Sequence, residues 1–358
     1  MRFLFRADAS TAIGSGHVAR CASLAQALAA AGHEVQFASR ALAGDLNHWL
    51  EAEGFRVHEI SGVADAAMTE SVDADATKKS VPAQRYDWLI VDHYGLGATW
   101  ERAMAALADG IFVIDDLGRH HDCDLLLDQN YENPTHALYS SRTPSGCELL
   151  LGPQFALLRP EFTALRPVAL RRRRDAISWI LVCMGGSDPF NETGKVLLGL
   201  SQLTQQRLRI DVAIGTGNPH RSAVEAACAG LRHATLHVQA SNMAELMAAA
   251  DCVICGAGNI TWERCALGLP GLATIMADNQ ASAAAAVDAA GAHQLLGWHH
   301  NLAAEDYARA LLAMDSAKLR RMSTAAAAIC DGGGVKRVAE RLSRNGHRKK
   351  RSLRAARA

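Results

Sequence analysis

A glycine loop that ends in a histidine is the feature of this sequence that points most directly to chemistry. Gly14–His17 reads Gly-Ser-Gly-His and stands between a short apolar run, Phe3–Phe5, and an alanine-rich helical pattern that starts near Val18. Glycines let the backbone approach a ligand closely, and the first N–H groups of a helix favour an anion. Histidine exchanges a proton near neutral pH. The combination predicts that His17 acts on a phosphorylated molecule.

Three more junctions between an apolar strand and a helix, all in the second half, carry residues suited to such a ligand. They are Gly185–Ser187, the glycine turn Gly256–Gly258 with Glu263 one helical turn later, and Asn279–Gln280. Glycine turns at helix starts cradle anions, a carboxylate can accept both ribose hydroxyls, and amides suit sugar hydroxyls and N-acetyl groups. Each residue is also an ordinary helix cap. A phosphate-bearing nucleotide explains the junctions together better than separate caps do.

Polar residues also follow several apolar runs in the first half of the chain. Asp92-His93-Tyr94, Asp115-Asp116 and Asp128-Gln129-Asn130 each come directly after such a run. Ligands of open parallel sheets bind beyond the carboxyl ends of the strands. We therefore expect these side chains to gather at one edge of a sheet.

The elements that position these residues alternate between strand and helix in both halves, which is typical of parallel α/β sheets. We predict a GT-B-like α/β fold with two Rossmann-like, doubly wound domains that face a cleft. Residues 1–160 form the first domain, a proline- and arginine-rich linker spans 161–175, residues 176–342 form the second domain, and 343–358 is a basic, disordered tail. The predicted strands are Phe3–Phe5, Val35–Ala38, Trp88–Val91, Ile111–Ile114, Leu125–Leu127, Ile177–Cys183, Ile210–Ile214, Thr235–Val238, Val253–Cys255 and Leu272–Met276.

Composition narrows the class of protein. The 358 residues include 37 Lys and Arg against 37 Asp and Glu, so the net charge does not indicate a nucleic acid or an anionic membrane as partner. The first residues lack a signal-peptide pattern, and no apolar run reaches the about 18 residues of a membrane span. The nine cysteines suit reduced thiols, with Cys252 and Cys255 in the core rather than on a metal. We expect a cytoplasmic protein with no nucleic acid partner and no membrane insertion, and the sequence indicates no protein partner.

The ordered set of motifs resembles a known family, the UDP-2,4-diacetamido-2,4,6-trideoxy-β-L-altropyranose hydrolases of pseudaminic acid biosynthesis. The resemblance extends over 1–341, and the second half is also similar to the glycosyltransferase that adds N-acetylglucosamine in lipid II synthesis, which implies a GT-B fold. The motifs that carry it are ADASTAIGSGHVARCASLAQAL, VDHYGLGATWE, IDDLGRHHDCDLLLDQN, LGPQFALLRPEF, MGGSDPFN and WERCALGLPG followed by ADNQ.

The resemblance implies a role for particular residues. His17 is the base that activates water, Tyr94 and Asn279 hold the sugar, Gly185–Ser187 face the diphosphate, and Glu263 binds the ribose. The complete set of candidate substrate-binding residues is Gly14, Ser15, Gly16, Arg20, Tyr94, Gly185, Gly186, Ser187, Gly258, Glu263, Asn279 and Gln280.

The implied reaction is displacement of UDP from the anomeric carbon by water, with inversion and with no metal or other cofactor. A single base is sufficient because UDP is a good leaving group, unlike the leaving group of an ordinary glycoside. His93, next to Tyr94, is the second candidate for that base. Three other functions remain open at this point: a UDP-sugar-dependent glycosyltransferase, a non-catalytic nucleotide-sugar binding protein, and a dehydrogenase that reads Gly14–Ala19 as a dinucleotide fingerprint. The last is disfavoured because the fingerprint glycine should follow its strand at once.

Overall fold

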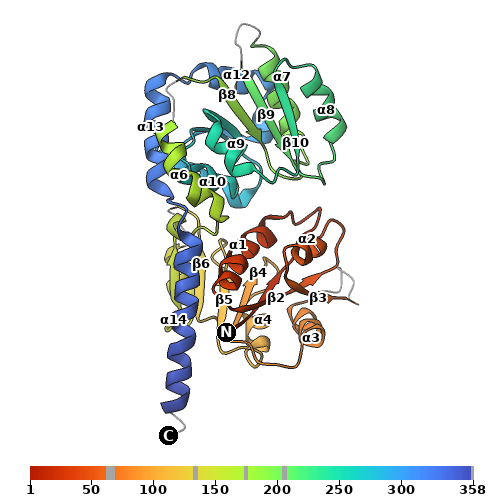
Figure 1. The fold of residues 1–358 in the computed structure, drawn as a ribbon, viewed down its shortest axis with the longest axis vertical. Coiled ribbons are helices and arrows are strands. Elements are labelled where there is room, and N and C mark those ends of the chain that lie inside the picture. Colours follow the sequence, from red (N-terminus) through yellow and green to blue (C-terminus); the bar gives the residue numbers. More distant parts are fainter. Residues whose placement is uncertain (62–68, 132–135, 173–175, 204–207, 356–358) are drawn as a thin grey trace. The chain divides into compact units, whose positions relative to one another are not determined.

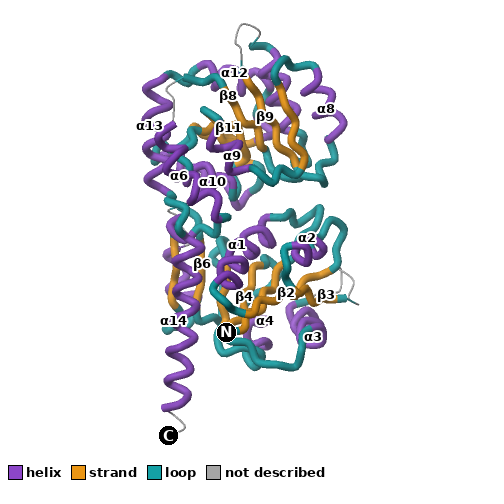
Figure 2. Tube along the Cα trace, in the orientation of Figure 1, coloured by secondary structure: helices purple, strands orange, loops and turns teal. Residues whose placement is uncertain are grey.

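The chain forms two compact units in the computed structural model, which describes residues 1–61, 69–131, 136–172, 176–203 and 208–355. The N-terminal unit contains Met1–Leu158 and Gly333–Ala358, and the C-terminal unit contains Arg159–Gly332. Each unit is a parallel sheet with helices on both sides (Figure 2). The alternation of strands and helices that the sequence predicts is confirmed.

The N-terminal unit has, within its described residues, a seven-stranded sheet in the order β3-β2-β1-β4-β5-β6-β7 (Figure 1). Alternate residues of one strand enter different cores: Phe3 and Phe5 pack with α1 and α14, whereas Leu4 packs with α3 and α4. Burial on both faces is why these strands are continuous apolar runs. The strands are β1 (Arg2–Ala7), β2 (Glu34–Arg40), β3 (Arg56–Ile60), β4 (Trp88–Asp92), β5 (Ile111–Ile114), β6 (Leu125–Asp128) and β7 (Glu148–Leu151), and the helices are α1 (Gly16–Ala30), α2 (Asn47–Ala52), α3 (Glu70–Ser80), α4 (Ala98–Met104), α5 (His136–Arg142), η2 (Pro153–Phe155) and α14 (Gly334–Ala355).

The C-terminal unit has six strands in the described part of its sheet, in the order β10-β9-β8-β11-β12-β13. Helices α7, α8 and α12 share one core with Ile180, Val182 and Ile210 of the central strands. The strands are β8 (Trp179–Cys183), β9 (Arg209–Ile214), β10 (Ala234–Val238), β11 (Cys252–Gly256), β12 (Gly271–Ile275) and β13 (Gln294–Trp298), and the helices are α6 (Pro160–Arg172), α7 (Glu192–Ser201), α8 (Arg221–Ala229), α9 (Met243–Ala249), α10 (Ile260–Ala266), η3 (Asp278–Gln280), α11 (Ala281–Ala289), η4 (His299–Asn301), α12 (Ala304–Leu312) and α13 (Ser316–Ile329).

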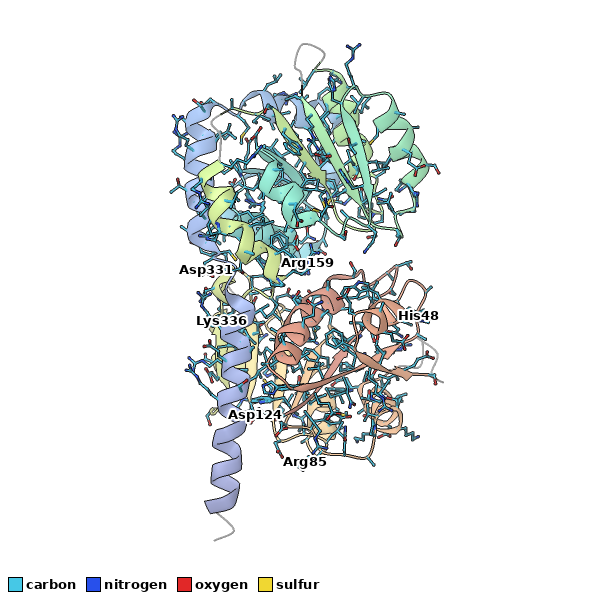
Figure 3. All side chains as sticks on the ribbon, viewed as in Figure 1. His48, Arg85, Asp124, Arg159, Asp331 and Lys336 are labelled. Carbon is cyan, nitrogen blue, oxygen red and sulfur yellow. The ribbon has the colours of Figure 1, made fainter. Side chains whose placement is uncertain are left out.

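Strand order brings the predicted site residues together within each unit. The strands β1, β4, β5 and β6 are neighbours, so the residues after them lie along one carboxyl edge. The strands β8, β11 and β12 are neighbours in the same way. In Figure 3, Arg85 and Asp124, which precede β4 and β6, lie at the opposite end of the N-terminal unit from His48, which follows β2.

The division of the chain differs from the sequence-based one. The segment expected as a linker, 161–175, is helix α6 of the C-terminal unit as far as Arg172, and 173–175 lies outside the described residues. The second domain ends at Gly332 rather than at 342, because α14 returns to the N-terminal unit, where Val338 and Leu342 are buried. The basic segment 343–358, expected as a disordered tail, is helical as far as Ala355. Lys, Arg and Ala are good helix formers and extend a helix whose first turns are fixed by packing.

A buried histidine makes the stability of the C-terminal unit sensitive to acid. The Nη2 of Arg264 donates to Nδ1 of His293 over 2.7 Å, and Nε2 of His293 donates to the carbonyl of Ala284. Burial, reinforced by the charge of Arg264, lowers the pKa of His293 to about 3. As the pH falls, the unfolded chain therefore binds a proton at this histidine before the folded chain does. Above about pH 6.5 His293 has no effect on the free energy of unfolding, and between about pH 6.5 and pH 3 it lowers that free energy by up to about 1.4 kcal/mol per pH unit.

The variant His293→Gln keeps an acceptor and a donor but cannot be protonated, so its stability is expected to change less with pH. Thermal unfolding midpoints of the wild type and of this variant between pH 7 and pH 4 provide the measurement. Two parallel curves would contradict the role of His293.

Candidate functional site

The loop that follows β1 places His17 at the start of α1. Ser10 Oγ accepts hydrogen bonds from the backbone N–H groups of Ala12 and Ile13, and the N–H of Gly14 donates to the carbonyl of Ser10. Gly14 has a φ of 82°, a conformation that favours glycine. Ser15 is the N-cap of α1, and Gly16 is its first residue. The loop is therefore a tight turn that delivers His17 in the first turn of the helix.

The imidazole of His17 is paired with a carboxylate that is 75 residues away in sequence. Its Nδ1 lies 2.6 Å from Oδ1 of Asp92 at the end of β4, and the two residues are 8% and 0% exposed. Because a carboxylate only accepts, Nδ1 carries the proton. Nη2 of Arg20 lies 3.3 Å from the same nitrogen, and within the described residues Nε2 makes no hydrogen bond. The pairing leaves Nε2 as the nitrogen that can take a proton from water, which is the arrangement of an oriented general base.

Arg20 holds the same carboxylate from the next turn of α1. Its Nε and Nη2 each donate to Asp92 over 2.6 Å. Burial by itself would raise the pKa of Asp92, but the charges of Arg20 and His17 outweigh it and hold that pKa well below its usual range. Asp92 therefore stays ionised. Arg20, which the sequence analysis lists for substrate binding, thus donates to Asp92 in this structure, and its contact with the substrate stays a prediction.

Tyr94 lies beside the histidine, as the sequence predicts for one site. Its ring packs edge to face against the His17 ring, with 4.7 Å between the ring centroids. Its hydroxyl donates to Oδ2 of Asp116, which follows β5, over 3.2 Å. Burial raises the pKa of Asp116, although Arg20 and the Tyr94 hydroxyl oppose the shift. The residues His17, Arg20, Asp92, Tyr94 and Asp116 form one cluster, which we call the histidine cluster.

His93, the second candidate for the base, is engaged at both ring nitrogens. The N–H of Gly95 donates to Nδ1 of His93 over 2.9 Å, and Nε2 faces Oδ2 of Asp8 at 3.4 Å. The proton must then lie on Nε2 and point to Asp8. Of the two candidates, His17 therefore has the geometry better suited to a base.

In the C-terminal unit, the loop after β8 leaves its glycines exposed. Gly185 has a φ of 120°, and the carbonyl of Gly186 accepts from the N–H of Gly215. The start of α7, however, is already capped: the carboxylate of Asp188 accepts the N–H groups of Glu192 and Thr193. A diphosphate would therefore meet the loop Gly185–Ser187 and not the N-terminus of α7, which the sequence had included in the anion cradle.

The turn after β11 carries Gly258 and leads into α10, where Glu263 lies in the first turn. Burial raises the pKa of Glu263 to about 7, with Arg159 opposing the shift and Glu161 adding to it. Thr261 Oγ1 is buried and has no hydrogen-bond partner among the described residues. Sequence reasoning did not select Thr261, although a hydroxyl at the start of a helix after a glycine turn was a usable signal.

The third junction, after β12, carries two amides, of which one is exposed and one is partly buried. Asn279 is exposed in the short helix η3. Gln280 accepts the N–H of Met276 through Oε1, and its Nε2 lies 3.5 Å from the position that a Cβ on Gly258 would occupy. Because β8, β11 and β12 are neighbours, the three junctions follow adjacent strands at one edge of the sheet.

The described residues contain neither a metal-binding cluster nor a membrane-spanning helix. No group of three or more His, Cys, Asp and Glu side chains in these ranges is arranged to hold a metal ion. No helix in the described part of the chain is long and apolar enough to cross a membrane.

Comparison with known proteins finds a family model that matches most of the C-terminal unit. Residues 180–342 match the family model of the glycosyltransferase family 28 C-terminal domain. Over 266 residues the chain is 27% identical to the UDP-2,4-diacetamido-2,4,6-trideoxy-beta-L-altropyranose hydrolase of Campylobacter jejuni, and the match covers 74% of this chain and 87% of that protein. The resemblance that the motifs indicate is therefore confirmed, and the chain is related to sugar-nucleotide-processing enzymes.

Solved structures confirm the predicted GT-B-like α/β fold. The MurG protein of Acinetobacter baumannii has a TM-score of 0.66 at 15% identity, with 96% of this chain and 99% of that one covered. The UDP-GlcNAc 2-epimerase of Neisseria meningitidis, solved with UDP-GlcNAc bound, has a TM-score of 0.59 at 14% identity, with 96% and 100% covered. At these identities the likeness is one of fold alone.

Proposed function

We propose that the protein hydrolyses a UDP-activated 2,4-diacetamido-2,4,6-trideoxyhexose, UDP-2,4-diacetamido-2,4,6-trideoxy-β-L-altropyranose, to the free sugar and UDP in pseudaminic acid biosynthesis. The observation that carries this proposal is the pairing of His17 Nδ1 with Asp92, which leaves Nε2 as a base. The name of the Campylobacter relative supports the choice of substrate.

The chemistry needs one proton acceptor and one stabilised leaving group. Water attacks C1 of the hexose, its proton passes to Nε2 of His17, and the bond between C1 and the diphosphate oxygen breaks with its electron pair leaving on UDP. A positioned base contributes about 10²–10⁴-fold in rate. A single displacement inverts the configuration at C1. No step in this sequence calls for a metal ion, so turnover is expected to persist in the presence of a chelator.

The C-terminal unit supplies the groups suited to UDP. The loop Gly185–Ser187 and the turn at Gly258 follow adjacent strands and offer backbone N–H groups to a diphosphate, and Glu263 offers a carboxylate to the ribose. Asn279 and Gln280 follow the next strand and suit the sugar and its acetamido groups. The epimerase of the same fold was solved with a UDP-sugar bound, which supports this assignment.

The decisive experiment offers the protein a panel of UDP-diacetamido sugars in ¹⁸O-labelled water with EDTA. Release of UDP, appearance of ¹⁸O on the sugar rather than on the phosphate, and an inverted product anomer in the NMR spectrum are expected. Binding of UDP without any turnover would instead favour a non-catalytic nucleotide-sugar binding protein.

A glycosyltransferase is the second candidate, because residues 180–342 match a glycosyltransferase domain. The two functions differ in the acceptor of the sugar. Consumption of the UDP-sugar in water alone, at a rate that added carbohydrate acceptors do not change, separates the hydrolase from the transferase.

The raised pKa of Glu263 gives a prediction for nucleotide binding. If its carboxylate accepts the ribose hydroxyls, binding requires the deprotonated form, so the affinity of the wild type for UDP should increase as the pH rises through about 7. In Glu263→Gln this increase should disappear. The terminal phosphate of UDP, which also titrates near pH 6, affects both proteins equally. Isothermal titration between pH 5.5 and pH 8.5 measures the difference, and an identical pH dependence in both proteins would rule out the ribose contact.

A further inference from the structure

The turn that carries Tyr94 is held by an arginine, Arg119. Arg119, in the connection between β5 and β6, donates through Nη1 to the carbonyls of Tyr94 and Leu96, over 2.6 and 2.9 Å. Its Nη2 donates to the carbonyl of His93 over 3.2 Å. One guanidinium therefore binds three carbonyls of a single turn, His93–Leu96.

Arg119 is itself fixed by a buried carboxylate. Its Nε donates to Oδ1 of Asp115 over 2.7 Å, and Asp115 is fully buried at the end of β5. The hydroxyl of Tyr139 donates to Oδ2 of Asp115 over 2.9 Å, and Nε2 of His121 lies 3.4 Å from the same oxygen. The hydrogen bond to Asp115 thus fixes the position of the guanidinium relative to the sheet.

The two consecutive aspartates after β5 therefore both act on Tyr94, one on its backbone and the other on its side chain. Asp115 fixes the backbone of Tyr94 through Arg119, and Asp116 accepts the Tyr94 hydroxyl. Tyr94 in turn contacts the His17 ring. We propose that Arg119 is a positioning residue, which acts on the reaction by fixing Tyr94 against His17. The proposal rests on the proposed function and on the sugar-binding role that the family resemblance implies for Tyr94.

Only a guanidinium can make this set of contacts. Its planar fork has five donors in fixed directions, so it binds the carboxylate with one edge and the carbonyls with the other. A lysine at the same place presents a single ammonium group and cannot span Asp115 and the turn together. Arg119→Lys keeps the positive charge but removes the hydrogen bonds that join Asp115 to the turn His93–Leu96. The variant therefore tests whether Arg119 positions the turn, separately from the effect of its charge.

The first measurement does not depend on any activity. Hydrogen exchange of the peptide that covers 93–97, followed by mass spectrometry, should be at least about tenfold faster in Arg119→Lys, because the turn loses its hydrogen bonds. The matched control is Arg142→Lys: Arg142 binds the carbonyl of Gly118 in the same connection and makes no hydrogen bond to the turn among the described residues. An unchanged exchange rate in Arg119→Lys would contradict the claim that Arg119 fixes this turn.

The second measurement asks whether Arg119 acts through Tyr94. Arg119→Lys is expected to lower kcat about 10- to 100-fold, because small displacements of a positioning group have effects of this size, while the Kd for UDP stays as in the wild type. In a Tyr94→Ala background the same change should cost no more than about twofold. The positioning role would be overturned if Arg119→Lys lowered kcat equally in the wild-type and Tyr94→Ala backgrounds. It would also be overturned if the wild type were active and Arg119→Lys left its kcat unchanged.

A wild type without hydrolase activity would contradict the proposed function instead. The exchange experiment would then still decide whether Arg119 fixes the turn.

Discussion

Replacing His17 by alanine is expected to lower turnover of the UDP-sugar about 10²–10⁴-fold while the affinity for UDP stays as in the wild type. The reason is geometric: Nε2 of His17 is the nitrogen that its pairing with Asp92 leaves to take a proton. The residues assigned to UDP belong to the other compact unit of the chain, so truncation of this side chain leaves them unchanged. Single-turnover kinetics and UDP titration measure the two quantities.

The matched control is His48→Ala. His48 lies in the same unit, its side chain is fully exposed, and its polar partner among the described residues is Glu51. Its removal should change neither turnover nor affinity. Turnover of His17→Ala within a factor of about three of the wild type would exclude His17 as the base, and the hydrolytic mechanism would then need another proton acceptor.

The second large effect is expected from Asp92→Asn, which is close to isosteric. The amide N–H of an asparagine can donate to Nδ1 of His17, which moves the ring proton to Nε2. A protonated Nε2 cannot accept a proton from water, so the ring no longer acts as a base. The equivalent change in the serine protease triad lowers kcat about 10⁴-fold with its geometry intact. We expect a loss of about 10²–10⁴-fold here, with the Kd for UDP unchanged.

The same substitution also leaves the buried charge of Arg20 without its counter-ion, since both of its donating nitrogens face Asp92. Breaking a buried ion pair costs up to about 3–5 kcal/mol, so the variant should also unfold at a lower temperature. Activity is therefore compared well below the unfolding transitions of both proteins.

Asp211→Asn separates the loss of stability from the loss of activity. Asp211 is a fully buried aspartate in the middle of β9, and it pairs with Nε2 of His237 over 2.7 Å. It thus resembles Asp92 in burial and in its histidine partner but does not lie at the carboxyl edge of its sheet. We expect Asp211→Asn to lower the unfolding temperature and to leave kcat as in the wild type. Equal kcat losses in the two variants would show that Asp92 acts through stability alone.

The central strands could be predicted from sequence because burial on both faces requires continuous apolar runs. The strands β1, β4, β5, β8, β11 and β12 all lie at predicted positions. The strands that the sequence analysis missed, β3, β7 and β13, are edge strands. Their residues are only partly buried, as in Gln294–Trp298, so the apolar signal is weak.

The sequence could propose candidate site residues where one residue type suffices for the chemistry. His17 and Tyr94 were selected from their motifs, and the structure places them in contact. Asp92 and Asp116 were noticed as polar residues after strands but received no role, because their partners are distant in sequence. Arg119 could not be selected at all, since its ligands are backbone carbonyls, which have no signature in sequence.

The sequence by itself determined the alternating α/β architecture, the glycine loop that begins a helix with a histidine, and the set of motifs that relates this chain to sugar-nucleotide enzymes. These features are local, so the spacing of residues along the chain is enough to define them. Only the tertiary structure decided that β4 lies beside β1, which joins His17 to Asp92 and thereby fixes which ring nitrogen carries the proton. It also decided that α6 and α14 belong to folded units, because burial against distant elements, and not local composition, sets where a helix packs.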